Sequence, residues 1–321
     1  MRFVKFAVAM AALAVGPAMA EEMPTIRAAV LKIGTVNWEL STITEAGLDE
    51  ARGFHLEMAP YADNGATRVA VEGGEADMAV ADWIWVARQR AAGKDYVFIP
   101  YSRAVGGLVA PKDSGVTSLK DLAGGKVGIA GGPLDKSWLI LRAYAQQEYG
   151  MDLKAETEQV FGAPPLIFKS ALGGELNGAI NFWHFLAKMK AAGMQEVISV
   201  DEAGKALGLN TDTPLLGYYL KESFLDEHPG LAQALYDASR DAKDLLASDD
   251  VAWDAIRPQM NASTDAQFET LKSDWLAGTP ARGPVDLDGA NRMLALMAEL
   301  GGAELVGEAT TVPEGLFAVV E

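Results

Sequence analysis

Aromatic and polar side chains gather where the short apolar segments of this chain end. Each such segment indicates a strand, and in an open α/β sheet ligands bind beyond the carboxyl ends of the strands. Asp135, Lys136 and Phe182 lie at these exits. The candidate ligand-binding residues chosen by this rule are Thr35, Asn37, Trp38, Asp82, Trp83, Ser102, Arg103, Gly131, Gly132, Ser137, Trp138, Asn181, Trp183 and His184.

The tryptophans of this set suit a flat or a cationic ligand. An indole face stacks on another ring, or attracts a quaternary ammonium by about 0.5–2 kcal/mol. For Trp38 and Trp183 we weigh ligand contact equally against sealing a boundary between two lobes, and for Trp83 ligand contact is the weaker alternative. The three tryptophans outside the set lie inside helical patterns and are expected in the core.

The charged candidates each have two interpretations. Arg103 could hold a carboxylate or sulfonate through two parallel hydrogen bonds, or form a hinge ion pair. Asp82 could meet a ligand amine, but capping a helix over 82–92 is the favoured role. The glycine-rich turn at 131–137 leaves backbone N–H groups that could seat an anion, although Asp135 is first expected as a helix cap.

Catalytic templates are poorly represented. The histidines are His55, His184 and His228, none has the spacing of a metal ligand set, and the chain has no cysteine. A triad of Ser137, His184 and Asp82 can be imagined, but a lone histidine at a strand exit is more often a hydrogen-bonding contact. We therefore expect no catalytic residue, no metal site and no cofactor.

Alternating strands and helices must position these residues. The helices lie between the strands and continue from about 229 to 300. This alternation is typical of a parallel or mixed α/β sheet. Strands are predicted over 26–33, 54–61, 78–81, 96–100, 105–110, 126–130, 196–200 and 215–220.

Two segments that lie a hundred positions apart share one pattern. Residues 71–83 are VEGGEADMAVADW, and residues 171–183 are ALGGELNGAINFW. Both run from a helix through Gly-Gly-Glu into an apolar strand with a tryptophan at its exit. We interpret them as one supersecondary unit used once in each of two similar lobes. The alternative is a chance match of a common helix-to-strand phrase.

The first twenty residues predict a signal peptide. Arg2 and Lys5 precede an apolar run over 6–15 that is too short to span a bilayer, and Ala18 and Ala20 form a small-x-small cleavage site. We expect cleavage after Ala20 and a periplasmic protein; a retained anchor is the weaker alternative. No cysteine follows, which excludes a lipid-anchored form.

Composition and length limit the classes of partner and the domain organisation that remain. A formal net charge of −17 argues against nucleic-acid or anionic-membrane partners, which demand a basic face. The roughly 300 residues after the signal peptide exceed what one core normally serves. We expect lobe 1 over 21–104 and 216–321, and lobe 2 over 105–215. The strands near 105–110 and 215–220 would form a two-crossing hinge in a monomer.

Residues 111–129, PKDSGVTSLKDLAGGKVGI, resemble the start of the second lobe in type II periplasmic substrate-binding proteins of ABC importers. The nitrate, sulfonate, taurine and thiamine-pyrimidine binders are the most similar. The resemblance implies two mixed or parallel sheets flanked by helices, and hinge closure on a small organic solute that is handed to an ABC permease. The ligand would be of sulfonate, carboxylate or heteroaromatic type. The specific pocket residues of these binders do not align here, which leaves the ligand open.

Two other classes of function remain open. One is an enzyme on the same fold, similar to menaquinone-pathway or pyrimidine-forming proteins. Such enzymes work in the cytoplasm, so the export signal weighs against this class. The other is a ligand-sensing subunit for a membrane receptor, which would share the pocket and differ in its partner.

Overall fold

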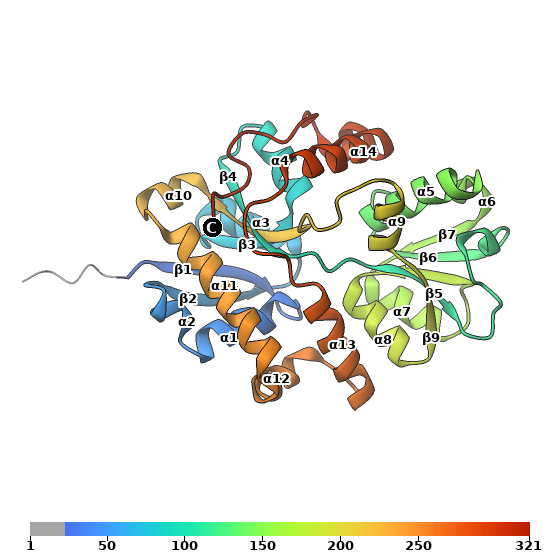
Figure 1. Ribbon diagram of the computed structural model, residues 1–321, viewed down its shortest axis with the longest axis horizontal. Helices are drawn as coiled ribbons and strands as arrows, with labels where there is room; N and C mark the ends of the chain where they lie inside the picture. The colour runs from blue at the N-terminus through green and yellow to red at the C-terminus, as the bar shows by residue number, and fades with distance from the viewer. Residues whose placement is uncertain (1–22) are drawn as a thin grey trace, which may run out of the picture.

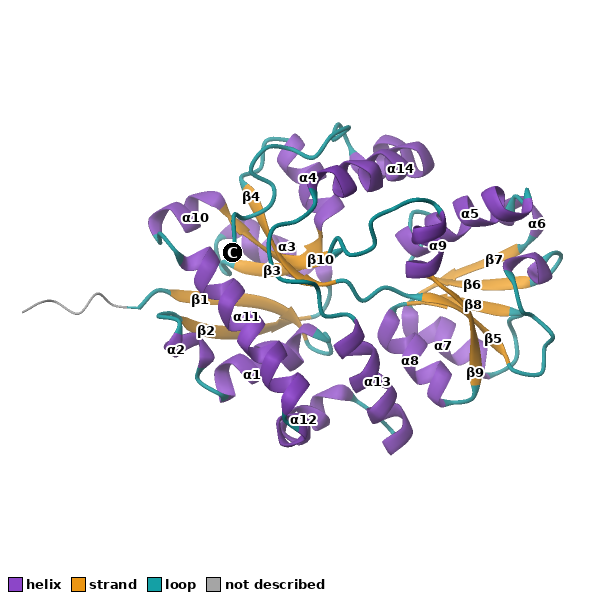
Figure 2. Ribbon diagram, in the orientation of Figure 1, coloured by secondary structure: helices purple, strands orange, loops and turns teal. Residues whose placement is uncertain are grey.

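The computed structural model describes residues 23–321, and the predicted signal peptide lies outside the described residues. Two five-stranded sheets lie side by side, each flanked by helices, which gives the two-lobed outline in Figure 1. The secondary structure in Figure 2 shows loops, not strands, between the two sheets. The predicted fold class, an α/β protein with two lobes, is confirmed.

The sheet of lobe 1 has the order β2-β1-β3-β10-β4. Strand β1 runs parallel to β2 and β3, whereas β10 is antiparallel to both of its neighbours, so the sheet is mixed. Its strands are β1 (Thr25–Leu31), β2 (His55–Tyr61), β3 (Met78–Asp82), β4 (Tyr96–Ser102) and β10 (Leu216–Lys221). Its helices are α1 (Val36–Glu45), α2 (Leu48–Ala51), α3 (Asn64–Gly73), α4 (Trp83–Ala91), α10 (Glu222–Glu227), α11 (Leu231–Ser248), α12 (Asp250–Ile256), η2 (Arg257–Met260), α13 (Asp265–Ala277) and α14 (Leu287–Val306).

The sheet of lobe 2 has the equivalent order β7-β6-β8-β5-β9. Here β5 is the antiparallel strand between β8 and β9, as β10 is in lobe 1. The strands are β5 (Gly107–Pro111), β6 (Lys126–Ala130), β7 (Glu158–Gly162), β8 (Gly178–Asn181) and β9 (Met194–Ser199). The helices are η1 (Leu119–Leu122), α5 (Lys136–Tyr149), α6 (Leu153–Glu156), α7 (Pro164–Leu172), α8 (Trp183–Ala191) and α9 (Val200–Ala206).

The two repeated sequence segments occupy equivalent places in these sheets. Each runs from the end of a helix, α3 or α7, through a glycine with positive φ into the central strand, β3 or β8. In both, the residue before the strand ties it to its neighbour: Asp77 accepts the Arg27 amide at 2.9 Å, and the Asn177 side chain accepts the Lys126 amide at 2.8 Å. The geometry supports the interpretation of one supersecondary unit used twice.

The chain crosses between the sheets through residues 103–106 and residues 207–215. We predicted the strands near 105–110 and 215–220 as the hinge. Residues 107–110 and 216–220 instead belong to β5 and β10, which lie between two neighbouring strands in each sheet, and residues 105, 106 and 215 belong to the crossings. A strand paired on both sides cannot bend freely, so the short unpaired segments before them form the crossings.

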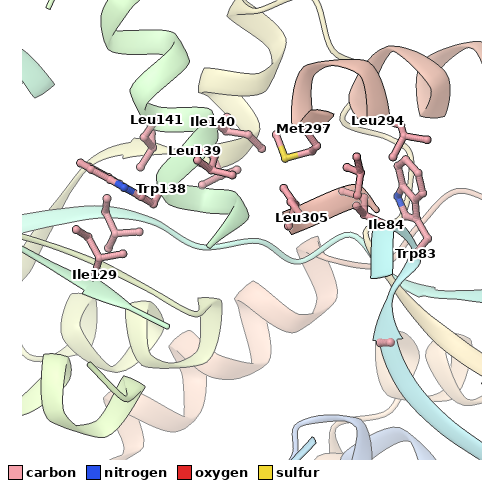
Figure 3. Packing of buried hydrophobic residues seen from close by; sticks show 14 of the residues in the cluster. Trp83, Ile84, Ile129, Trp138, Leu139, Ile140, Leu141, Leu294, Met297 and Leu305 are labelled. Atoms are coloured by element: carbon pink, nitrogen blue, oxygen red, sulfur yellow. The ribbon is translucent and has the colours of Figure 1, made fainter. Parts of the chain in front are cut away.

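Apolar side chains also join the lobes. One buried cluster contains residues of both sheets, and Figure 3 shows Leu139 and Ile140 of α5 opposite Met297 and Leu305 of α14. A second cluster joins α8 of lobe 2 to α13 of lobe 1. Because burial of apolar surface stabilises an interface at roughly 25 cal/mol per Å², these contacts favour the observed arrangement of the lobes.

Candidate functional site

Strand exits of the two lobes meet at an ion pair. Asp82, at the end of β3, accepts a hydrogen bond from the Trp85 amide at 2.8 Å, which confirms its predicted role as the cap of α4. Its other oxygen lies 2.8 Å from the ammonium of Lys136, the first residue of α5 in lobe 2. Both side chains are largely buried, so this ion pair connects the lobes in a poorly solvated position.

Two tryptophans also meet across the lobe boundary. The rings of Trp38 in α1 and Trp183 in α8 have centroids 5.7 Å apart in an edge-to-face arrangement. Their exposed fractions are 2% and 7%. Both belong to the cluster that joins α8 to α13. The structure therefore places them where the lobe-sealing alternative expected them, while contact with a ligand stays a prediction.

The start of α5 is already occupied by a carboxylate. Asp135 accepts a hydrogen bond from the Trp138 amide at 3.1 Å, as predicted for a cap. Burial raises the pKa of Asp135 above its ordinary value. One N–H group at the start of this helix, that of Trp138, therefore already has an acceptor within the protein.

Two other candidate tryptophans lie in the cores. Trp83 and Trp138 are each 1% exposed. Figure 3 shows Trp83 beside Ile84 and Leu294 in lobe 1, and Trp138 beside Leu141 and Ile129 in lobe 2. Both stand at the beginning of a helix whose inner face covers a sheet, which directs their rings into the lobes and away from the boundary between them.

Arg103 and Ser102 lie where β4 leads into the first crossing. The Arg103 guanidinium makes two long hydrogen bonds, 3.4 Å to the Thr279 carbonyl and 3.4 Å to Asp212 in the second crossing. The hinge ion pair weighed from the sequence is therefore present. The hydroxyl of Ser102 accepts a hydrogen bond from the Ala104 amide at 3.0 Å and helps to shape the same turn.

A cavity of about 230 Å³ opens beside this crossing, between the lobes. Lobe 1 contributes the end of α13, and lobe 2 contributes α8, β9 and the start of α9. Of the fourteen candidate residues, Arg103 and Trp183 line it. The lining residues are Arg103, Ala104, Val105, Trp183, Leu186, Lys190, Glu196, Ser199, Asp201, Asp274, Ala277 and Gly278.

The remaining candidates lie at the strand exits with mixed surroundings. Thr35 is the N-terminal cap residue of α1 without a side-chain cap bond, and the side-chain oxygen of Asn37 is buried without a hydrogen-bond partner among the described residues. Asn181 is buried, donates to the Pro164 carbonyl at 3.0 Å and accepts from the Phe182 amide at 2.8 Å.

The other lobe-2 candidates divide between packing and exposure. A Cβ added to Gly106 would lie 2.0 Å from the Asn181 carbonyl and 3.7 Å from the Ser137 hydroxyl, so Ser137 lies beside the first crossing. In the turn before α5, Gly131 is exposed and Gly132 is partly exposed. The His184 ring contacts neighbouring aromatic rings, and burial, with help from Lys188, lowers its pKa to about 4. His184 is therefore neutral at pH 7.

A buried polar network behind Trp38 was not found from the sequence. Glu39 and Lys243 form an ion pair in which both side chains are at most 3% exposed, and Tyr218 donates to Glu39 at 2.8 Å. Lys243 also lies 4.8 Å from the centre of the Tyr101 ring. Burial lowers the pKa of Lys243. No short motif marks such a pair, because its partners lie 204 residues apart.

No helix within residues 23–321 has both the length and the apolar character needed to cross a membrane. Within the same range, no three or more histidine, aspartate or glutamate side chains converge as a metal site would require.

Comparison with known proteins decides the family. The family described as NMT1/THI5 like matches residues 44–250, well over half of the chain. The chain belongs to the NMT1/THI5-like family. No curated protein matches this NMT1/THI5-like chain in a sequence search.

Solved structures share the fold of this NMT1/THI5-like protein at low identity. The periplasmic aliphatic sulphonate binding protein SsuA from Escherichia coli matches with a TM-score of 0.70 at 15% identity, over 88% of this chain and 89% of that one. The alkanesulfonate-binding protein SsuA from Xanthomonas axonopodis pv. citri, bound to MOPS, matches with 0.67 at 16%, over 94% and 100%. A DszB mutant in complex with biphenyl-2-sulfinic acid matches with 0.58 at 15%, over 92% and 98%. At these identities the likeness establishes the fold.

Proposed function

We propose that this protein is the periplasmic substrate-binding component of an ABC importer. It captures a small organic solute of sulfonate, carboxylate or heteroaromatic type between its lobes, as a monomer, and delivers it to a membrane permease. Membership of the NMT1/THI5-like family and the shared fold with sulfonate-binding periplasmic proteins support this function. The predicted signal peptide, with cleavage after Ala20, supports the periplasmic location.

The observation that carries the proposal is the cavity between the lobes. Its wall combines both lobes with the first crossing, and it includes Arg103 and Trp183. A solute that contacts both lobes binds best when they stand in one arrangement, so binding shifts the population of lobe orientations toward it. We also propose that lobe 1 comprises residues 21–104 and 216–321, and that lobe 2 comprises residues 105–215.

An enzymatic function is not part of the proposal, although DszB shares the fold. Asp82, the acid of the imagined triad, directs its two oxygens to the Trp85 amide and the Lys136 ammonium. The His184 ring contacts Phe182, Trp183 and Phe185, and within residues 23–321 it forms no ion pair with a carboxylate of the kind that orients a catalytic imidazole. A ligand-sensing subunit would use the same cavity and differ only in its partner.

The test is a panel of sulfonates, carboxylates, amino acids and pyrimidines, screened by thermal unfolding and followed by calorimetry. A solute at 100 times its dissociation constant adds about 2.7 kcal/mol to the free energy of unfolding. We expect Trp183→Phe to weaken binding, because Trp183 lines the cavity. Trp85→Phe is the matched control, since Trp85 packs against Tyr96 and Tyr219 in lobe 1. A panel without any hit would remove the proposal.

A further inference from the structure

The charge pattern of the cavity narrows the class of solute. An anionic group at the start of α5 would face the Asp135 carboxylate, which already accepts the Trp138 amide there. The ammonium of Lys136 is likewise engaged by Asp82. A carboxylate or sulfonate brought to this place would meet two acidic side chains. The hydrogen-bond donors for an anion must therefore come from elsewhere between the lobes.

Most charges that line the cavity are already well paired. The Lys190 ammonium lies 2.8 Å from Asp274, in an ion pair between α8 and α13. Asp201 lies 2.7 Å from Lys205, one helical turn further along α9. The pKa of Lys190 is raised, since the attraction of the carboxylates outweighs its burial. A ligand of either charge would therefore add little electrostatic stabilisation to these groups.

Two opposite charges in the same wall are only weakly engaged. Both side-chain hydrogen bonds of Arg103 are 3.4 Å long, and its acidic partner Asp212 is 73% exposed, so this pair contributes little. Glu196 has one ion pair, to Lys190, at 3.4 Å. Within residues 23–321, Arg103 and Glu196 form no ion pair with each other. They thus present spare donors and spare acceptors to one cavity.

We propose that the solute is a zwitterion of amino-acid size, with its anionic group on Arg103 and its ammonium on Glu196. This rests on the proposed function and adds the charge pattern of the ligand and the two residues that recognise it. The guanidinium fork suits a carboxylate bidentately. Trp183, Leu186 and Ala277 supply apolar wall for the carbon chain. The cavity of about 230 Å³ has room for a small organic molecule of amino-acid size.

The experiment compares three probes by calorimetry: β-alanine, propionate and n-propylamine. Propionate lacks the ammonium, and n-propylamine lacks the carboxylate. Because a hydrogen bond to a charged group contributes about 1.5–3 kcal/mol, we expect each truncated probe to bind about 10- to 100-fold more weakly than β-alanine. Arg103→Gln should remove the preference for β-alanine over n-propylamine, and Glu196→Gln the preference over propionate. Arg52→Gln, on the far side of lobe 1, is the matched control and should change neither ratio.

The outcomes separate this inference from the proposed function. Equal affinity for β-alanine and propionate, or an Arg103→Gln protein that keeps the wild-type ratios and melting temperature, overturns the zwitterion. Binding of another solute class without β-alanine also overturns it and leaves the proposed function standing. If no solute of the wider panel binds, the proposed function itself falls.

Discussion

The two lobes share one sheet topology, and they differ at the exits of their central strands, β3 and β8. Segments 71–83 and 171–183 enter the sheet through the same turn and fill the same central position, as β3 and β8. At the exits they diverge. Trp83 turns into the core of lobe 1, whereas Trp183 reaches Trp38 across the boundary. The shared turn sets the position of the central strand in each sheet. The residues that follow the strand determine whether the tryptophan packs within its own lobe or against the other lobe.

A second difference between the lobes is a buried charge pair. Among the ion pairs of residues 23–321, the pair of Glu39 and Lys243 in lobe 1 has both side chains at most 3% exposed, and those of lobe 2 are far more solvated. Lobe 1 thus holds a network that lobe 2 lacks in the described residues.

Removing half of this pair is the change with the largest expected effect. Lys243→Met leaves the carboxylate of Glu39 buried without its cation, and we expect a loss of about 3–5 kcal/mol in the free energy of unfolding. Lys205→Met, in the exposed Asp201 pair of lobe 2, should cost at most about 0.5 kcal/mol. Urea denaturation measures both. If the free energy of unfolding of Lys243→Met lay within about 1 kcal/mol of the wild-type value, the buried ion pair would not make lobe 1 differ from lobe 2 in stability.

Equivalent glycines in the antiparallel strands come next. A Cβ at Gly217 in β10 would lie 2.2 Å from the Phe98 ring and 2.4 Å from the Ile99 carbonyl. At Gly107 in β5 the nearest atom, the Ile198 carbonyl, would be 2.8 Å away. Since overpacking typically costs 1–3 kcal/mol, we expect Gly217→Ala to destabilise by about that much and Gly107→Ala by less.

The control for the glycines is Gly73→Ala at the end of α3, where a new Cβ meets nothing within 4 Å. It should be neutral or stabilising in the same denaturation experiment. If Gly107→Ala proved the more damaging change, the ranking of β5 and β10 by their packing would be reversed.

The caps of α1 and α5 predict a pH dependence confined to one lobe. Thr35 occupies the N-cap position of α1 without a side-chain cap bond and carries no charge, whereas burial raises the pKa of Asp135 above its ordinary value, with Lys136 and Asp82 as charged neighbours. The folded protein therefore binds this proton more tightly than the unfolded chain does. Its stabilising contribution is complete below the ordinary pKa and is lost as the pH rises through the raised one.

Asp135→Asn tests this sign, because asparagine still accepts from the Trp138 amide without ionising. We expect the melting temperature of the variant, relative to wild type, to rise between about pH 3 and pH 7. Thr35→Ser should show no such trend. A difference between Asp135→Asn and wild type that falls with pH would contradict the assigned direction.

The smallest effect is expected for a substitution that makes the turns before β3 and β8 more alike. Asp77→Asn gives lobe 1 the side chain that lobe 2 has in Asn177. It removes the ion pair with Arg27, whose side chain is 44% exposed, and keeps an acceptor for the Arg27 amide. We expect a loss below about 1 kcal/mol in denaturation experiments. Asp77→Ala should cost more, because the amide then loses its acceptor.

Local signals predicted much of this fold. Strand β6 and the caps Asp82 and Asp135 lie where expected, because a cap bonds to amides two or three residues away. Strand β7 was missed. It is an edge strand that begins with Glu158 and Gln159 and is partly exposed, so it lacks a continuous apolar run.

The sequence predicted the candidate residues as a group that lies at strand exits. Only the tertiary structure shows which of them line the cavity and which lie in the cores. Arg103 and Trp183 reached one cavity, whereas Trp83 and Trp138 entered the cores. The sequence pattern places all four at the start of a helix or loop after a strand. Nothing local distinguishes a tryptophan that faces its own sheet from one that faces the opposite lobe.

The sequence by itself determined most of the strand and helix order, the repeated turn and the resemblance to two-lobed binding proteins, because each depends on neighbours within a few residues. Tertiary structure alone decided the direction of β5 and β10, the burial of Glu39 against Lys243, and the meeting of Asp82 with Lys136. Those outcomes depend on atoms brought together from distant parts of the chain, where burial and pairing energies outweigh local preference.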